Sequence, residues 1–179
     1  MSQLLTTVTS LVNAMTDTEV RTRLAEYMAA DERLQPQPVG VEIRLSENRG
    51  SSRYDVLLIL DDGSEELIKF PDRYSRLVYI YTLMHPDGYQ RRFLQSDDYR
   101  QLRQLYSQLY FTSPERLLKT IGSKFDQFFN QSVAQSRVAI RRTGSHAHLF
   151  EIASPTKHNG RTLIPAAATA TVIIDNTLL

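Results

Sequence analysis

The chain has 179 residues and a net charge of +1, and its 41% hydrophobic and 23% charged residues are close to the averages of globular proteins. This length suits one domain with a small appendage, and the composition excludes collagen-like repeats and long-range disorder. There is no cysteine, which excludes disulfides, thiolate metal ligands and a cysteine nucleophile.

The first 35 residues are predicted to form a helical appendage. Apolar residues recur at the spacing of one helical face over residues 4–15, and Thr16-Asp17-Thr18-Glu19 has the form of a capping box that starts a second helix. Pro36 and Pro38 end this helix, because a proline pushes the residue before it out of the helical conformation. These helices are expected to pack on the rest of the chain, and the alternative is that they couple two copies in a homodimer.

Residues 39–70 change to a period of two, which predicts strands. The alternation at the start of this stretch places four side chains on the buried face of a first strand: Val39, Val41, Ile43 and Leu45. A second strand is expected over residues 54–60, apolar on both faces in its later half. Asp61-Asp62-Gly63 is a hairpin turn signal, because glycine accepts a positive φ, and residues 66–70 form the returning strand. Together these patterns predict a small antiparallel meander.

From Pro71 onward the period is 3.6, which predicts helices. Four are expected: residues 74–84, a helix from Ser96, one from Ser113, and residues 123–143, ending at Gly144. The first two have apolar stripes that should be buried: Tyr74, Leu77, Val78, Tyr81 and Met84, then Tyr99, Leu102, Tyr106 and Leu109. Strand-like runs follow at residues 149–152, 161–164 and 171–175, which predict a terminal sheet.

This order of elements has a counterpart among known folds. The turn at Asp62-Gly63 leads through Phe70 into the run Arg76–Pro86, and Arg137–Arg142 is followed by strand, turn and strand. Residues 54–175 thereby resemble the winged-helix effector domain of OmpR/PhoB-type response regulators. The resemblance implies an α+β fold with a winged-helix-like domain over residues 39–179, built from a small antiparallel sheet, a helical bundle and a C-terminal β-hairpin wing. It also implies DNA binding in transcriptional control.

The helix over residues 123–143 is the strongest candidate for contact with DNA. At 100° per residue one face gathers core side chains: Phe125, Phe129, Val133, Ser136 and Ile140. The opposite face carries Lys124, Gln127, Gln131, Gln135, Arg141 and Arg142, with Arg137 on a flank. Arginine and glutamine make bidentate contacts with guanine and adenine in the major groove. We therefore expect Gln131, Gln135, Arg141 and Arg142 to approach base edges, and Arg137, Lys157 and Arg161 to neutralise phosphate.

The charge distribution agrees with a surface that faces a polyanion. Residues 1–70 carry 7 Lys/Arg and 12 Asp/Glu, a net charge of −5, whereas residues 71–179 carry 14 and 8, a net charge of +6. Eight bases and only two acids lie between Arg116 and Arg161. A solvated basic face without a partner is the alternative interpretation.

Other chemistry is less well supported, and we expect neither an enzyme nor a cofactor. His146, His148 and His158 lack further ligands for zinc, so no metal site is expected. The acids at Asp61-Asp62 and Asp97-Asp98 are explained as turn and helix-start residues rather than as a general acid–base pair. The tyrosines Tyr79, Tyr81, Tyr89, Tyr99, Tyr106 and Tyr110 are expected to be core residues rather than a stacking platform for single strands.

A rival from another class is a protein–protein interaction module on a winged-helix scaffold that binds no nucleic acid. The low net charge and the acidic first 70 residues favour it. An exposed apolar patch on the N-terminal helices would support this rival, whereas a continuous positive surface beside residues 123–143 would support DNA binding. No signal peptide is visible and no apolar run approaches ~20 residues, so a cytoplasmic protein without membrane contact is expected.

Overall fold

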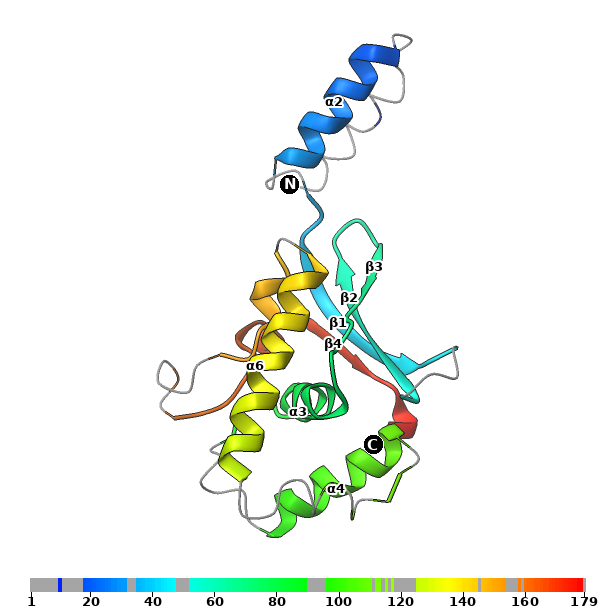
Figure 1. Cartoon of the computed structure of the whole chain (residues 1–179). Coiled ribbons are helices and arrows are strands. Elements are labelled where there is room, and N and C mark those ends of the chain that lie inside the picture. Colours follow the sequence, from blue (N-terminus) through cyan, green and yellow to red (C-terminus); the bar gives the residue numbers. More distant parts are fainter. Residues whose placement is uncertain are drawn as a thin grey trace.

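The computed structural model describes residues 10, 18–31, 35–47, 52–89, 96–110, 112–113, 115, 117, 125–144, 146–153, 158 and 160–178, apart from the side chains of residues 19, 28–30 and 96–99. Within these ranges the fold is α+β, as expected, with a small mixed sheet and four α-helices. One helix, α3, lies between the sheet and α6 (Figure 1). No helix in the described part of the chain is long and apolar enough to cross a membrane.

The sheet has four strands in the order β3-β2-β1-β4. β1 (Pro38–Leu45), β2 (Tyr54–Leu60) and β3 (Glu65–Leu67) form the predicted antiparallel meander, although β3 is shorter than expected. The predicted turn between β2 and β3 is confirmed, since Gly63 has a φ of 84°. β4 (Thr171–Ile174) then pairs with β1 in the parallel direction and makes the sheet mixed.

The predicted burial of the first strand is half right. Val41 and Ile43 are fully buried, but Val39 is 45% exposed and Leu45 is 49% exposed. The pairing of β1 with β2 shifts register between Pro38 and Gly40, so the alternation that starts at Val39 does not continue into the paired part of the strand. Leu45 is the last residue of β1 and is exposed, although its partner on β2, Tyr54, is buried.

Two predictions for the C-terminal part are wrong. The stretch predicted as a strand at residues 149–152 begins in a 3-10 helix, η3 (Ala147–Phe150). Its apolar residues Phe150 and Ile152 are buried as predicted, but they reach the core without pairing in a sheet. The last strand pairs with β1 and not with residues 161–164. In that stretch Thr162 forms only an isolated antiparallel bridge with Tyr89, and the Leu163 carbonyl accepts a hydrogen bond from the Ala153 amide at 2.8 Å.

Gly40 allows β1 and β4 to approach closely. A Cβ at Gly40 would stand 2.5 Å from the backbone oxygen of Thr171, so an added methyl group forces β4 to move. We expect Gly40→Ala to lower the free energy of unfolding by about 1–3 kcal/mol in urea denaturation. Val39→Ala, at an exposed position of the same strand, is the control and should cost only about 0.5 kcal/mol. Wild-type stability of Gly40→Ala would contradict this pairing.

The helix α3 (Arg73–Leu83) forms the centre of the fold. Its N-cap is Asp72, whose Oδ1 accepts hydrogen bonds from the amides of Tyr74 and Ser75, both at 2.8 Å. The predicted stripe is buried at Leu77, Val78 and Tyr81, and the burial in fact extends around the whole helix from Leu77 to Leu83. A helix apolar on all sides is typical of the interior of a domain.

The remaining helices follow the sequence pattern. α2 (Thr18–Ala30) ends before the prolines and stands apart from the sheet in Figure 1. α4 (Ser96–Tyr110) buries Leu102, Tyr106 and Leu109 as predicted. α6 (Phe125–Thr143) stops before Gly144, as predicted. The expected helix starts at Thr16 and Ser123 lie outside the described residues.

The tyrosines belong to the core, as expected. Tyr79, Tyr81 and Tyr106 are at most 1% exposed and Tyr110 is also buried. The Tyr79 hydroxyl donates a hydrogen bond to the Phe150 carbonyl at 3.1 Å, and burial raises the Tyr79 pKa far above its usual value. This neutral phenol ties α3 to η3. The side chain of Tyr99 lies outside the described part.

Candidate nucleic-acid interface

The predicted core face of α6 is confirmed. Its buried side chains recur every three or four residues: Phe128, Phe129, Ser132, Val133, Ser136, Ala139 and Ile140. Phe125 is half-buried and packs against the same core. This face rests on α3, so the opposite side of a 19-residue helix is held rigidly toward solvent.

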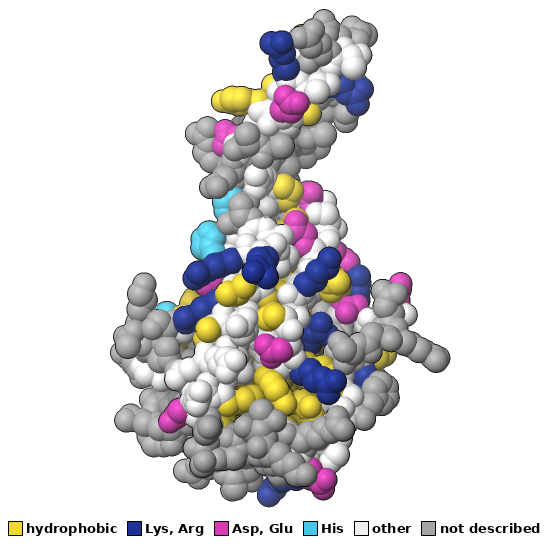
Figure 2. Space-filling model, viewed as in Figure 1, with side chains coloured by type: hydrophobic (Ala, Val, Ile, Leu, Met, Phe, Trp, Pro, Cys, Tyr) yellow, Lys and Arg dark blue, Asp and Glu magenta, His cyan; other side chains and the backbone are white. Residues whose placement is uncertain are grey.

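The outward side of α6 carries most of the predicted contact residues. Gln127, Gln131, Arg141 and Arg142 are exposed, whereas Gln135 and Arg137 are half-buried. At 100° per residue Gln135 and Arg137 lie on opposite flanks of the exposed strip. Figure 2 shows Lys and Arg side chains gathered on this face, over the C-terminal part of α6 and the segment between β3 and α3.

Arg137 is engaged by the chain itself. Its Nε donates a hydrogen bond to the Ile152 carbonyl at 2.8 Å, and Ile152 is 1% exposed. A buried carbonyl needs such a partner, because an unsatisfied acceptor is costly away from water. Arg137 therefore fixes the segment after η3 to the flank of α6.

Arg141 is paired as well. Its Nε and Nη2 donate to the two carboxylate oxygens of Glu151, at 2.7 and 2.9 Å. The hydrogen bond to this carboxylate raises the pKa of Arg141, and the pair cancels one positive charge of the outward face. A bidentate pair of this kind also orients the guanidinium.

Arg142 and Gln131 are in a different situation. Both are exposed, and within the described ranges no residue forms an ion pair with Arg142. Arg161 is exposed too, and its amide donates to the His158 carbonyl at 2.8 Å. Lys157, the last of the predicted contact residues, lies outside the described residues.

The histidines and acids are the residues that the sequence offers as metal ligands or as a general acid–base pair, and several of them have local partners in the described residues. The rings of His146 and His148 are 6.4 Å apart, and no group of three potential ligands occurs in that part of the chain. Asp61 Oδ1 accepts a hydrogen bond from the Gln37 amide at 3.0 Å, which joins the residue before β1 to the turn after β2. Asp62 Oδ1 accepts from the amide and hydroxyl of Ser64, and these bonds lower the Asp62 pKa.

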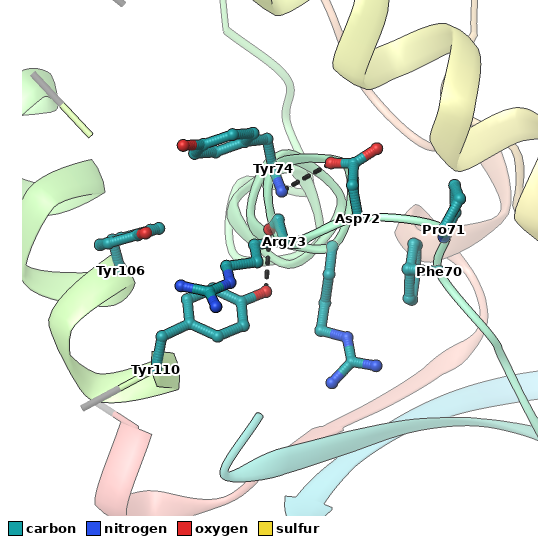
Figure 3. Close-up of a pocket in the computed structure, with 8 residues that line it drawn as sticks. Phe70, Pro71, Asp72, Arg73, Tyr74, Tyr106 and Tyr110 are labelled. Carbon is teal, nitrogen blue, oxygen red and sulfur yellow. Dashed lines mark hydrogen bonds between the residues drawn. The ribbon is translucent and has the colours of Figure 1, made fainter. Parts of the chain in front are cut away.

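A cleft at the start of α3 is missing from the sequence-based expectations. It has a volume of about 550 Å³ and lies between the N-terminal turn of α3 and the end of α4 (Figure 3). It is lined by Phe70, Pro71, Asp72, Arg73, Tyr74, Arg76, Tyr106 and Tyr110. The only local signal is the run from Phe70 to Arg76, in which aromatic and arginine side chains alternate around a helix start.

Comparisons with known proteins give no further assignment. No protein-family model matches the chain, and neither a curated protein nor a solved structure matches it. The function must therefore be inferred from the residues and the geometry of this chain alone.

Proposed function

We propose that the protein binds double-stranded DNA through the outward face of α6, as a transcriptional regulator with a winged-helix-like fold. The observation that carries the proposal is the division of α6 into two faces: one is buried on α3, and the other presents Gln127, Gln131 and Arg142 to solvent. A helix of 19 residues is about 28 Å long, and the major groove is wide enough to admit a helix.

The contacts found around α6 refine the residue roles. Gln131 and Arg142 are the leading candidates for base edges, with Gln135 at the rim of the same flank. Arg141 faces the groove as one half of its pair with Glu151, so it adds less net charge than Arg142. Arg137 stabilises the docking of α6 through its Nε, and only its Nη groups are left for the predicted phosphate contact.

The segment after α6 supplies the second part of the proposed surface. Arg137 joins α6 to Ile152, and the next residue, Ala153, bonds to Leu163. The chain that carries Arg161 is therefore held on the Arg137 flank of α6. This arrangement supports a role for Arg161 in contacting phosphate beside the groove. The phosphate contact of Lys157 stays a prediction from the sequence.

A protein-interaction role remains the second candidate, because α2 exposes apolar surface. Tyr27 is 66% exposed and Val20 is 44% exposed, and seven residues apart they share one side of the helix. Such a surface suits coupling of two copies or of another protein. In a homodimer it would set two DNA half-sites about one helical turn apart.

Fluorescence anisotropy with a labelled random-sequence duplex tests the DNA-binding proposal. We expect the wild type to bind at low salt and to lose affinity steeply toward physiological salt, because bound counterions are released on binding. Arg142→Ala should weaken binding and reduce the slope of log affinity against log salt by about 1. Arg100→Ala removes the same charge from an exposed position of α4 and should leave the slope unchanged.

Two results would overturn the proposal. The first is the absence of binding to duplex DNA even at low salt. The second is equal weakening by Arg142→Ala and Arg100→Ala, which would mean that any exposed cation of the protein serves equally well and that α6 has no special role.

A further inference from the structure

We propose that the cleft at the start of α3 is a second binding site, for a phosphate monoester carried on a planar ring, the chemistry of a mononucleotide. The proposal is independent of DNA binding by α6. It rests on the arginine and aromatic side chains that line the cleft. The volume of about 550 Å³ lies within the usual range for small-molecule sites.

Two guanidinium groups are held in place at this cleft. The Arg73 Cζ lies 5.9 Å from the centre of the Tyr110 ring, and the Arg76 Cζ lies 5.7 Å from the centre of the Phe70 ring. Arg76 Nη1 also donates to the Tyr54 carbonyl at 3.1 Å. Because a ring contact and a hydrogen bond already restrict Arg76, an anion bound by its guanidinium costs less ordering entropy. Arg73 is exposed and is restricted by its ring contact alone.

The charge of the cleft favours an anion. Two arginines and one aspartate line it, which leaves an excess of one positive charge. The single carboxylate, that of Asp72, uses its Oδ1 to cap α3. Within the described part of the chain neither Arg73 nor Arg76 forms an ion pair. The amides of Tyr74 and Ser75 are satisfied by the cap, so the arginines supply the donors for a phosphate.

The aromatic side chains indicate what carries the phosphate. Tyr74 is half-buried and lies nearly parallel to Tyr106, with ring centres 6.2 Å apart, and both rings border the cleft in Figure 3. The buried Tyr110 donates its hydroxyl to the Arg73 carbonyl at 2.8 Å, and burial raises its pKa, so the phenol stays neutral beside an anion. Phe70 and Tyr74 are half-buried, so each keeps part of its ring accessible beside the two guanidinium groups, which suits a planar ring with an attached phosphate.

Ligand-observed NMR titration with AMP, adenosine and inorganic phosphate tests this site. We expect saturable binding of AMP, and binding of adenosine and of phosphate at least tenfold weaker, because each makes half of the contacts. Arg73→Ala should weaken AMP binding at least tenfold and leave adenosine binding unchanged. Arg73 is exposed, so the fold should tolerate its loss, which the circular dichroism melting curve checks. Arg142→Ala, on α6, is the matched control and should bind AMP like the wild type.

The proposal is overturned if AMP does not bind saturably, if adenosine binds as tightly as AMP, or if Arg73→Ala binds AMP like the wild type. Binding of a short single-stranded oligothymidine that depends on Arg73, without binding of AMP, would also overturn it, because the cleft would then be part of a nucleic-acid surface. The Arg142→Ala variant separates the two sites: it should lose duplex DNA affinity and keep AMP affinity.

Discussion

Replacing Phe129 by alanine is expected to lower the free energy of unfolding by about 3–5 kcal/mol. Phe129 is fully buried on the α3-facing side of α6. Its ring lies edge-on to Tyr89, with centres 6.0 Å apart, and 5.9 Å from the ring of Phe125. The substitution removes the largest fully buried side chain of α6 and leaves a cavity between that helix and the residues it covers.

Urea denaturation followed by circular dichroism measures this loss. Gln127→Ala is the matched control, because it changes an exposed position on the opposite side of the same helix and should alter stability by no more than about 0.5 kcal/mol. If Phe129→Ala were as stable as Gln127→Ala, α6 would not be docked by this face, and its outward face would not be the one described above.

The second large effect is expected at Arg137. Arg137→Ala should destabilise the protein by about 1.5–3 kcal/mol, because it removes a charge-assisted hydrogen bond and leaves the buried Ile152 carbonyl without that donor. Arg142→Ala removes the same charge five residues further along α6 and should leave stability within about 0.5 kcal/mol of the wild type. Thermal or urea denaturation of the purified variants measures both changes in stability.

The difference in stability between Arg137→Ala and Arg142→Ala distinguishes an arginine that stabilises the fold from one that faces solvent on the same helix. Arg137→Lys is a further check, because lysine keeps the charge but not the geometry of the guanidinium Nε, and it should recover only part of the stability. Equal stability of Arg137→Ala and Arg142→Ala would show that the bond to Ile152 contributes nothing to stability, which would contradict the structural role of Arg137.

Local patterns predicted the local elements well. The 3.6-residue period located the buried face of α6, since burial of Phe129, Val133 and Ile140 depends only on which side of one helix is apolar. The Gly63 turn was equally visible, because the positive φ is a property of a single residue. These features need no knowledge of distant parts of the chain.

Features that depend on distant residues were not predictable in the same way. Nothing in the four residues of β4 states that they pair in parallel with β1, more than 120 positions earlier. The run at residues 149–152 is apolar but too short for periodicity to distinguish a strand from a turn of 3-10 helix. Both outcomes depend on residues elsewhere in the chain, and those contacts are a property of the assembled fold.

The candidate DNA-binding face of α6 also combines features that a local pattern predicts with features that depend on distant residues. The sequence placed Gln131 and Arg142 on the outward face of α6 correctly, because helical periodicity alone decides that. It did not reveal that Arg141 pairs with Glu151, or that Arg137 bonds to Ile152, since these partners lie beyond the helix. The cleft could not be predicted from a local pattern, because its walls come from two separate segments, the start of α3 and the end of α4.

Mapping the DNA contact by NMR tests the central claim most directly. Amide correlation spectra of nitrogen-15-labelled protein would be recorded during titration with a short duplex. The account predicts that the largest shifts occur at the outward residues of α6, such as Gln127, Gln131 and Arg142, and near Arg161, while the exposed residues of α2 and β3 change little. Shifts confined to α2 or to the sheet edge at β3, with α6 unaffected, would contradict it.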